Sequence, residues 1–335
     1  MKKLILSLFI LLVLITSLDA KTLYVDVASI GGACSDTYTN ATNSITQPFC
    51  SIQRGVNVLT SIDDIIVRNG TYTDTDYDGM IVNINNIDGT SGDWIRIYAE
   101  NQNEAILDGQ LSNFTRLTGT WTQYSGNVYS SSVAFPVYYM SHGAVCSGLS
   151  TCTNGGTGAA TKKGSIATLT ADHDWYYESG TVYYKYGGID TVRQIFASDG
   201  ATYAIYMVNS SYVKIEGFEI KNARSGVITD TSNNINVYRN KIHDLNRIQY
   251  YCTWQGVGVG FGIAVGNNYL ATDITIDSNI IYNNGRLPAS CGNDYNHDHG
   301  VYAYGDRHTI INNVFSNHLS GWAIAPAGLY HETNL

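Results

Sequence analysis

One group of residues that could perform chemistry is a polar segment at positions 293–302. In it, Asp298 lies between His297 and His299, and Gly300 follows. Imidazole titrates near neutral pH, so His299 with Asp298 could transfer protons or bind a metal ion. In an extended segment, His297 and His299 would point to one side and Asp298 to the other. The alternative is that His299 and Gly300 only form the turn that leads into a strand.

A second candidate set alternates with apolar residues that are expected to face inward, so its members form outward columns. One column contains Glu216, Tyr238 and Asp277, the next contains Glu219 and Lys241, and a third contains Lys221, His243 and Tyr282. Lys241 or His243 could act as a general base, because both side chains accept a proton when uncharged. Glu216 and Asp277 could hold a cation, since carboxylate oxygens are preferred ligands of Ca²⁺. The alternative is that Lys241 and Glu219 form a solvated ion pair on neighbouring strands, which is common in sheets.

These candidates lie within a pattern of apolar and amide residues that repeats between positions 213 and 315. The matching positions are Val213, Ile215, Phe218 and Ile220; Ile235, Val237, Asn240 and Ile242; Ile274, Ile276, Asn279 and Ile281; and Ile310, Asn313 and Phe315. Apolar residues alternate within each unit, which is the period of a β-strand. A unit this short cannot bury its own apolar face, so the units must stack on one another. The sequence therefore predicts a parallel solenoid of short strands.

Stacking places equivalent residues of successive units about 4.8 Å apart. Asn240, Asn279 and Asn313 are expected to form an internal ladder of hydrogen-bonded amides. Two further turn columns are Asn222, Asp244, Asn283 and Asn317, and Gly226, Gly262, Gly300 and Gly321, where backbone torsion is expected to matter.

The six cysteines suggest three disulfides, although sequence alone allows fifteen pairings. Spacing favours Cys34 with Cys50, Cys146 with Cys152, and Cys252 with Cys291. Cys252 follows Asn240 by 12 residues, and Cys291 follows Asn279 by the same number. Equal offsets on neighbouring units place both cysteines in adjacent loops.

The first twenty residues have the build of a secretory signal peptide. Lys2 and Lys3 precede an apolar run from Leu4 to Ile15, and cleavage is expected after Ala20. An uncleaved N-terminal anchor is the alternative. Later segments are not apolar enough to cross a bilayer, so the mature protein is expected to be secreted or held at the cell surface without a stable membrane span.

The overall charge excludes some partners. Charged residues make up 14% of the chain and the formal net charge is -9, so no basic surface for nucleic acid or anionic lipid is expected. A polyanionic substrate would be repelled unless local lysines, arginines or a bound cation reversed the field. The 33 glycines and 26 tyrosines favour many short strands and tight turns.

Segments at the N-terminal end carry a resemblance to a known family. LYVD at 23–26, QPFCSIQ at 47–53 and IIVRNGTY at 65–72 resemble the opening of secreted pectate-lyase-like β-helix proteins. Residues 94–99 and 105–109 look like the next coils. The resemblance covers roughly residues 22–110 and 205–325. It implies an all-β fold, a right-handed parallel β-helix with an N-terminal cap, whose members include polysaccharide lyases, glycoside hydrolases, epimerases and non-catalytic surface proteins.

Four parts follow from the pattern and the resemblance. After the signal peptide at 1–20, residues 21–110 form the cap and first coils, and residues 111–204 form a small β-rich aromatic insertion. Residues 205–335 form coils with disulfide-linked loops, and the C-terminal portion is expected to be incomplete. The aromatic residues of the insertion could stack on sugars; the alternative is that they form its own core.

The resemblance implies a carbohydrate-active protein, and β-elimination by a polysaccharide lyase is the expected reaction. Such lyases pair a basic residue with Ca²⁺, so the expected catalytic residues are Lys241, His243, Asp298 and His299, and the expected Ca²⁺ ligands are Glu216 and Asp277. The expected substrate-binding residues are Tyr238, Tyr282, Tyr302, Trp254 and Arg286. The alternative is a non-catalytic adhesin or glycan-binding protein. The partner is a polysaccharide or glycan, and a monomer is expected.

Overall fold

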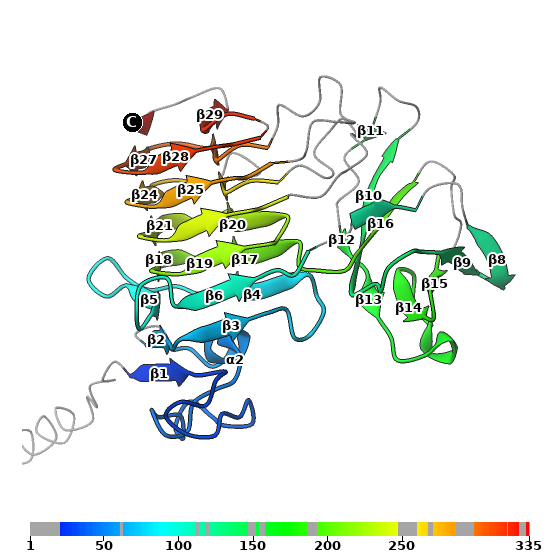
Figure 1. Ribbon diagram of the computed structural model, residues 1–335, viewed down its shortest axis with the longest axis horizontal. Coiled ribbons are helices and arrows are strands. Elements are labelled where there is room, and N and C mark those ends of the chain that lie inside the picture. The colour runs from blue at the N-terminus through cyan, green and yellow to red at the C-terminus, as the bar shows by residue number, and fades with distance from the viewer. Residues whose placement is uncertain are drawn as a thin grey trace, which may run out of the picture.

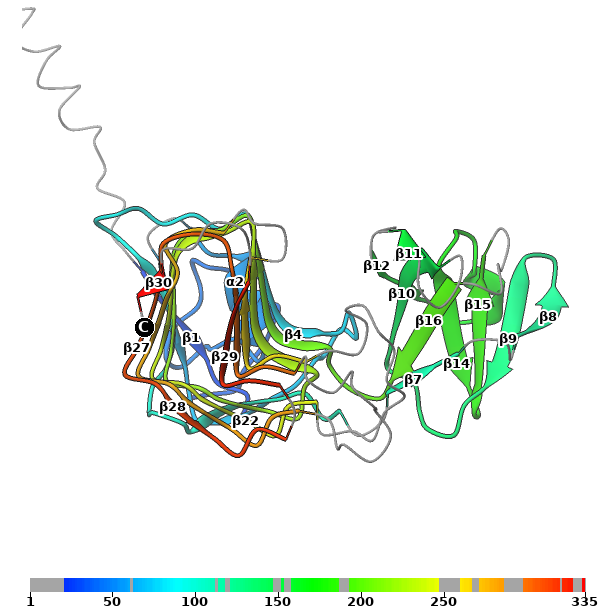
Figure 2. The same cartoon turned by 90° about the horizontal axis from the view of Figure 1, so that it is seen from above.

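The chain folds into a right-handed parallel β-helix with a smaller β-structure at its side, which confirms the predicted fold class (Figure 1). The computed structural model describes residues 21–60, 63–111, 114–117, 121–146, 152–153, 158–186, 193–246, 260–266, 271–285, 298–319, 321–327 and 333–334. Figure 2 looks along the helix axis and shows that equivalent strands of successive coils lie over one another.

Three parallel sheets form the helix, and every strand pairs with its equivalent in the next coil. Sheet A contains β1 (Thr22–Val25), β2 (Asp64–Val67), β5 (Ile95–Ala99), β18 (Ser211–Glu216), β21 (Asn233–Tyr238), β24 (Thr275–Asp277), β27 (His308–Ile311) and β30 (Thr333–Asn334). Sheet B contains β3 (Gly70–Tyr72), β6 (Ala105–Asp108), β19 (Glu219–Lys221), β22 (Lys241–His243), β25 (Ile280–Tyr282) and β28 (Val314–Ser316). Sheet C contains β4 (Met80–Asn85), β17 (Tyr203–Val208), β20 (Ser225–Asp230), β23 (Ile263–Val265), β26 (Val301–Tyr304) and β29 (Ile324–Ala327).

Alternating apolar residues fill the interior as the sequence predicts. In sheet A, Ile215 pairs with Val237, which pairs with Ile276 in the next coil, and all three are fully buried. The N-terminal end is closed by helix α2 (Ile52–Asn57), whose first turn is capped by the Ser51 hydroxyl accepting the Arg54 N–H. The cap covers apolar side chains of the first coil that would otherwise meet water.

The predicted asparagine ladder is present at the turn between sheets A and B. The Asn240 side-chain amide donates to the Asn279 oxygen at 3.1 Å, and that of Asn279 donates to Asn313 at 3.0 Å. The same Asn279 oxygen also accepts the Asn240 backbone N–H at 2.9 Å. Each ladder residue thereby satisfies the backbone of the coil below it.

The column of Gly226, Gly262 and Gly300 is present, but the reason for glycine differs from the predicted one. A Cβ at Gly226 would lie 2.4 Å from the Gly262 carbonyl oxygen, and one at Gly262 would lie 2.4 Å from that of Gly300. Close approach of stacked backbones, rather than torsion, therefore selects glycine at these positions. The equivalent of Gly300 in the last coil is Ala323, since Val301 bonds to its carbonyl, so the inclusion of Gly321 is wrong.

The described strands between positions 114 and 198 form two small, mostly antiparallel sheets. One contains β7 (Phe114–Arg116), β10 (Tyr139–Cys146), β11 (Cys152–Thr153), β12 (Gly158–Ala159) and β16 (Arg193–Ser198); the other contains β8 (Thr122–Ser125), β9 (Val128–Ser132), β13 (Thr161–Lys162), β14 (Asp174–Glu178) and β15 (Thr181–Lys185). Trp175, Val182 and Tyr184 are fully buried in a core of this insertion. For these aromatic residues, the alternative of a local core is confirmed.

The disulfide between Cys34 and Cys50 is present, with a Cα–Cα distance of 4.9 Å. Cys146 and Cys152 face each other as backbone partners of β10 and β11, and their bond stays a prediction. Cys252 and Cys291 lie outside the described residues, as does the predicted signal peptide. None of the helices in the described part of the chain has the length and apolar character needed to span a membrane.

Candidate functional site

The structure distributes the predicted site residues over the outer faces of different sheets. Sheet A carries Glu216, Tyr238 and Asp277; sheet B carries Lys241, His243 and Tyr282; Asp298 and His299 lie where the chain enters sheet C, which carries Tyr302. Trp254, Arg286 and His297 lie outside the described residues. The predicted columns are therefore confirmed, but they do not converge on one site.

Glu216 and Asp277 do not form a shared cation site. Tyr238 lies between them in the register, so they are two strand spacings apart, about 10 Å. Glu216 lies 2.9 Å from the Lys214 amine, while Asp277 accepts hydrogen bonds from Ser278 and Asn312 at 2.8 and 3.0 Å. Since Ca²⁺ binds oxygens at about 2.3–2.6 Å, this assignment of the ligands is wrong.

Lys241 and His243 are both bound to Glu219. The Lys241 amine lies 3.1 Å from one Glu219 oxygen, and the His243 Nε2 lies 3.2 Å from the other. Burial lowers the pKa of Lys241, but its hydrogen bond to Glu219 and the charge of that carboxylate outweigh burial and raise it. Lys241 therefore stays protonated as the ion pair that the sequence left as an alternative, and it is a poor base.

Asp298 and His299 hold the backbone of neighbouring coils. Asp298 is fully buried, and its Oδ1 accepts hydrogen bonds from the Asn246 side chain at 3.1 Å and the Gly260 N–H at 2.9 Å. The His299 Nδ1 accepts the Trp322 N–H at 3.0 Å. Because Nδ1 is an acceptor in this contact, the neutral ring carries its proton on Nε2.

The long connections of the helix leave at one corner, between sheets B and C. The insertion joins β6 to β17 there, and the later connections from β22 to β23 and from β25 to β26 also run from sheet B to sheet C. The insertion starts and ends at one point, since the Ala201 N–H donates to the Gly109 carbonyl at 2.8 Å. Figure 2 shows that the insertion faces sheet C, so this sheet is the one flanked by extra structure. Loops at such places commonly carry function.

Three groups of aromatic side chains lie at this corner and on sheet C, and we call them together the aromatic strip. Its members are Tyr77, Tyr138, Tyr203, Tyr206, Phe261, Tyr302 and Trp322. Tyr77 and Tyr138 stack with ring centroids 5.4 Å apart, as do Tyr203 and Tyr206. Trp322 is 64% exposed at the far end. Flat apolar faces on different coils along the β-helix suit an extended chain of sugar rings.

Lys162 of the insertion lies at the start of the strip. Its amine is 4.0 Å from the centroid of Tyr77 and 5.5 Å from those of Tyr138 and Trp175. Burial lowers the pKa of Lys162, and the negative charge of Asp74 opposes this only in part. The sequence offered no signal for Lys162, because the insertion lies outside the repeat.

The loop from Thr73 to Gly79 carries three carboxylates. Oxygens of Asp74, Asp76 and Asp78 lie within 4.8 Å of one another, so they could hold one cation. Burial raises the pKa of Asp74 to about 7, and the charge of Asp78 adds to this; burial likewise raises the pKa of Asp78 to about 6. The spacing D-x-D-x-D-G, typical of Ca²⁺ loops, was a local signal that sequence reasoning missed.

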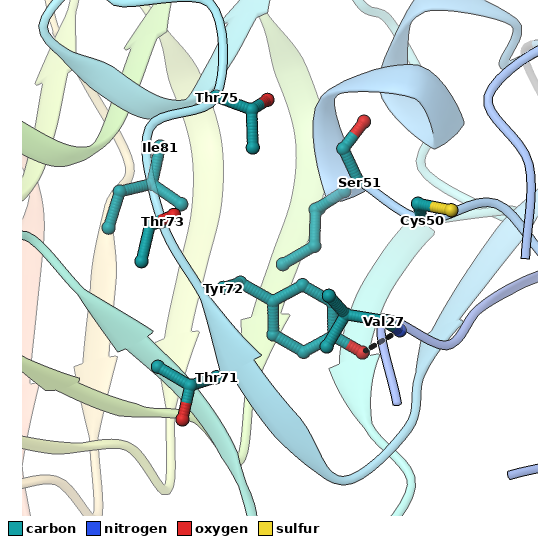
Figure 3. Close-up of a pocket in the computed structure, with 9 residues that line it drawn as sticks. Val27, Cys50, Ser51, Thr71, Tyr72, Thr73, Thr75 and Ile81 are labelled. Atoms are coloured by element: carbon teal, nitrogen blue, oxygen red, sulfur yellow. Dashed lines mark hydrogen bonds between the residues drawn. The ribbon is translucent and has the colours of Figure 1, made fainter. Parts of the chain in front are cut away.

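A separate small cavity lies near the N-terminal cap (Figure 3). It encloses about 50 Å³ and is lined by side chains from α2, β3 and their neighbours, including Ile52, Thr71 and Tyr72. The Tyr72 hydroxyl donates to the Arg68 carbonyl at 2.8 Å. This volume has room for a few water molecules but not for a sugar ring, so we assign it no function.

Comparison with known proteins places the chain in a family. A search of the curated proteins found no match. Among solved structures, the chain is similar to the alginate lyase from Paenibacillus sp. str. FPU-7, with 14% identity, 91% of this chain and 58% of that chain covered, and a TM-score of 0.37. It is also similar to the pectate lyase Pel9A, with 14% identity, 89% and 48% covered, and a TM-score of 0.44. The GH136 lacto-N-biosidase from Eubacterium ramulus gives 11% identity, 93% and 56% covered, and a TM-score of 0.40.

The chain spans about half to two thirds of the length of the first structures that it matches. A family model described as "Right handed beta helix region" matches residues 139–315, which is more than half of the chain. This match agrees with the stacked parallel sheets. The chain belongs to the family of proteins with a right-handed beta helix region.

Proposed function

We propose that the protein is an exported enzyme that cleaves an extended, uronate-containing polysaccharide by β-elimination. The observation that carries this proposal is the position of Lys162, whose amine lies over the stacked rings of Tyr77 and Tyr138. The polysaccharide would lie along the aromatic strip, with sugar faces against the rings. The Cys34–Cys50 disulfide supports export, because such bonds form in oxidising compartments.

The reaction needs a base, and Lys162 is the proposed one. Its uncharged amine takes the proton from the carbon next to the uronate carboxylate. The released electron pair forms a carbon–carbon double bond while the bond to the glycosidic oxygen breaks, and that oxygen takes a proton from solvent. The lowered pKa of Lys162 increases the uncharged fraction near neutral pH.

Ca²⁺ is the proposed cofactor, and Asp74, Asp76 and Asp78 are its proposed ligands. Their oxygens lie within 4.8 Å of one another, which fits oxygens bound to one ion at about 2.3–2.6 Å. Bound Ca²⁺ would neutralise a uronate carboxylate and make the neighbouring C–H more acidic. The chain's own residues then have two tasks: the three carboxylates would hold the cation beside Tyr77, and Lys162 removes the proton.

The test is ultraviolet absorbance of unsaturated uronate products on a panel of uronate polysaccharides, with Ca²⁺ or with a chelator. We expect absorbance to grow with at least one polymer, and to do so only with Ca²⁺. Release of reducing ends without this absorbance would show hydrolysis instead. Absence of both signals with every polymer would remove the enzymatic proposal.

A non-catalytic glycan-binding protein is the second candidate. It is favoured by the pairing of Lys241 and His243 with Glu219, which leaves these two predicted bases engaged on sheet B. Binding to the same polysaccharides without any cleavage, measured by affinity electrophoresis, would support this candidate.

A further inference from the structure

Three polar side chains lie near one another on the outer face of sheet C: Asn83 and Tyr206 are direct neighbours, and Asp230 is diagonal to Tyr206. Asn83, Tyr206 and Ile228 are direct register partners on β4, β17 and β20, and Asp230 lies two residues beyond Ile228 on the same face. Their neighbours Ile84, Ile205 and Met207 are buried in the core, so the alternation directs the polar side chains outward. Tyr206 also stacks on Tyr203 of the aromatic strip at 5.4 Å.

Two oxygen atoms at this place are buried and have no hydrogen-bond partner. They are Oδ1 of Asp230, a residue only 9% exposed, and Oδ1 of Asn83. Leaving a buried acceptor without a donor costs about 1–3 kcal/mol. Native proteins retain such groups chiefly where a ligand or water supplies the missing donor.

We infer that Asn83, Tyr206 and Asp230 form a subsite for an uncharged sugar ring, whose hydroxyl groups donate to the two buried oxygens while its face lies against Tyr206. This inference rests on the proposed function, because it concerns the same strip. Sugar hydroxyl groups can donate to the oxygens of Asn83 and Asp230, and the apolar face of a sugar suits the ring of Tyr206.

Charge makes the subsite selective. Tyr206 lies within the electrostatic influence of Asp230, and burial followed by the Asp230 charge raises the pKa of Tyr206 to about 12. A uronate carboxylate at this place would meet a partly desolvated carboxylate, and like charges in a desolvated site repel strongly. The substrate is therefore a copolymer that contains uncharged sugars as well as uronates, rather than a polymer of uronates alone, and an alternating copolymer is its simplest form.

Calorimetric titration of the full chain with two hexasaccharides tests this inference. One contains only uronates, and the other alternates uronates with uncharged sugars. We expect the alternating one to bind at least tenfold more tightly. Asp230→Asn should reduce this preference to less than threefold, because it removes the charge and keeps an acceptor. Asp277→Asn, which removes the same charge from the outer face of sheet A, should leave the preference unchanged.

The possible results separate this inference from the proposed function. Equal affinities for the two hexasaccharides, or an unchanged preference in Asp230→Asn, would overturn the subsite alone, since Lys162 and cleavage are not involved. Failure of both hexasaccharides to bind would overturn the subsite and the proposed function together. Should Asp230→Asn unfold, as judged by thermal melting, Asn83→Ala replaces it: we expect at least fivefold weaker binding of the alternating hexasaccharide, and unaltered binding would refute the subsite.

Discussion

Glu219 binds several basic residues on the outer face of sheet B and so limits which of them could act as a base. Its carboxylate lies 3.5 Å from the Lys221 amine, 3.1 Å from that of Lys241 and 3.2 Å from the His243 ring. Burial alone would raise the pKa of Glu219, but hydrogen bonds from Lys241 and His243 and their charges lower it. Glu219 raises the pKa of Lys241 in return, so Lys241 is a poor proton acceptor and the proposed base lies elsewhere.

The role of Lys162 as the base can be tested by Lys162→Ala. We expect kcat to fall at least 100-fold, because loss of a general base lowers the rate by about 10²–10⁴. KM should change less than threefold, since the aromatic binding surface remains. Steady-state kinetics on the active polymer measures this. Lys185→Ala, another lysine of the insertion, is the control and should keep the wild-type rate. An Lys162→Ala enzyme with more than half of the wild-type kcat would exclude the proposed base.

The carboxylate loop makes stability depend on pH and on Ca²⁺. Burial raises the pKa of Asp74 to about 7 and that of Asp78 to about 6, so the folded state binds their protons more tightly than the unfolded state does. The resulting stability is complete below about pH 4 and is lost as pH rises to about 7. In a chelator, the Tm should therefore be lower at pH 8 than at pH 5.

Ca²⁺ should raise the Tm at pH 8 and have little effect at pH 5, because protons compete with it for the same oxygens. Scanning calorimetry of the wild type and of Asp78→Asn measures this, and the variant should lose most of the Ca²⁺ effect. If Ca²⁺ leaves the Tm at pH 8 unchanged, the loop is not a Ca²⁺ site.

At the scale of elements, the turn between sheets A and B depends on its buried amides. Asn279 is fully buried, accepts two hydrogen bonds from Asn240 and donates to the Val237 carbonyl at 2.8 Å. Its neighbours in the column repeat this arrangement, so each coil fixes the spacing of the next. Such a network is stabilising only when every member is satisfied.

Asn279→Ala is expected to lower the free energy of unfolding by about 3 kcal/mol, since it leaves a buried N–H and a buried carbonyl without partners. Urea unfolding followed by circular dichroism gives the value. Asn101→Ala, an exposed asparagine in a turn, should cost less than about 0.5 kcal/mol. Equal effects of the two substitutions would mean that the ladder does not stabilise the stack.

At the scale of the whole molecule, the insertion and the β-helix have separate cores. Trp175 and Tyr184 belong to the core of the insertion, whereas the helix interior is formed by stacked aliphatic residues such as Ile215 and Val237. The two ends of the insertion meet at Gly109 and Ala201, so its removal would leave no gap in the coil. The helix is therefore expected to fold without it.

Replacement of residues 111–199 by two glycines should leave a cooperatively unfolding β-protein that no longer cleaves polysaccharide, because Lys162 and Tyr138 are removed with the insertion. Circular dichroism, thermal melting and the absorbance assay measure these properties. Cleavage by the shortened chain at the wild-type rate would contradict the proposed role of the insertion.

The sequence by itself determined the stack of coils, the asparagine ladder and the Cys34–Cys50 disulfide. These features depend on alternation and on short spacings, which are properties of neighbouring residues in the chain. The outward columns that contain Lys241 and His243 were predicted correctly for the same reason. The period of a strand decides which side chains face water.

Only the tertiary structure decided which outward side chains meet. Lys162 reaches Tyr77 because the insertion folds back beside the first coil, and no periodicity extends across that distance. The sequence also could not show that Glu219 binds both Lys241 and His243, because register fixes a column but not its partners. Burial depends on what covers a face of a sheet or a loop. The raised pKa values of Asp74 and Asp230 are caused by burial, so they could be found only from the tertiary structure.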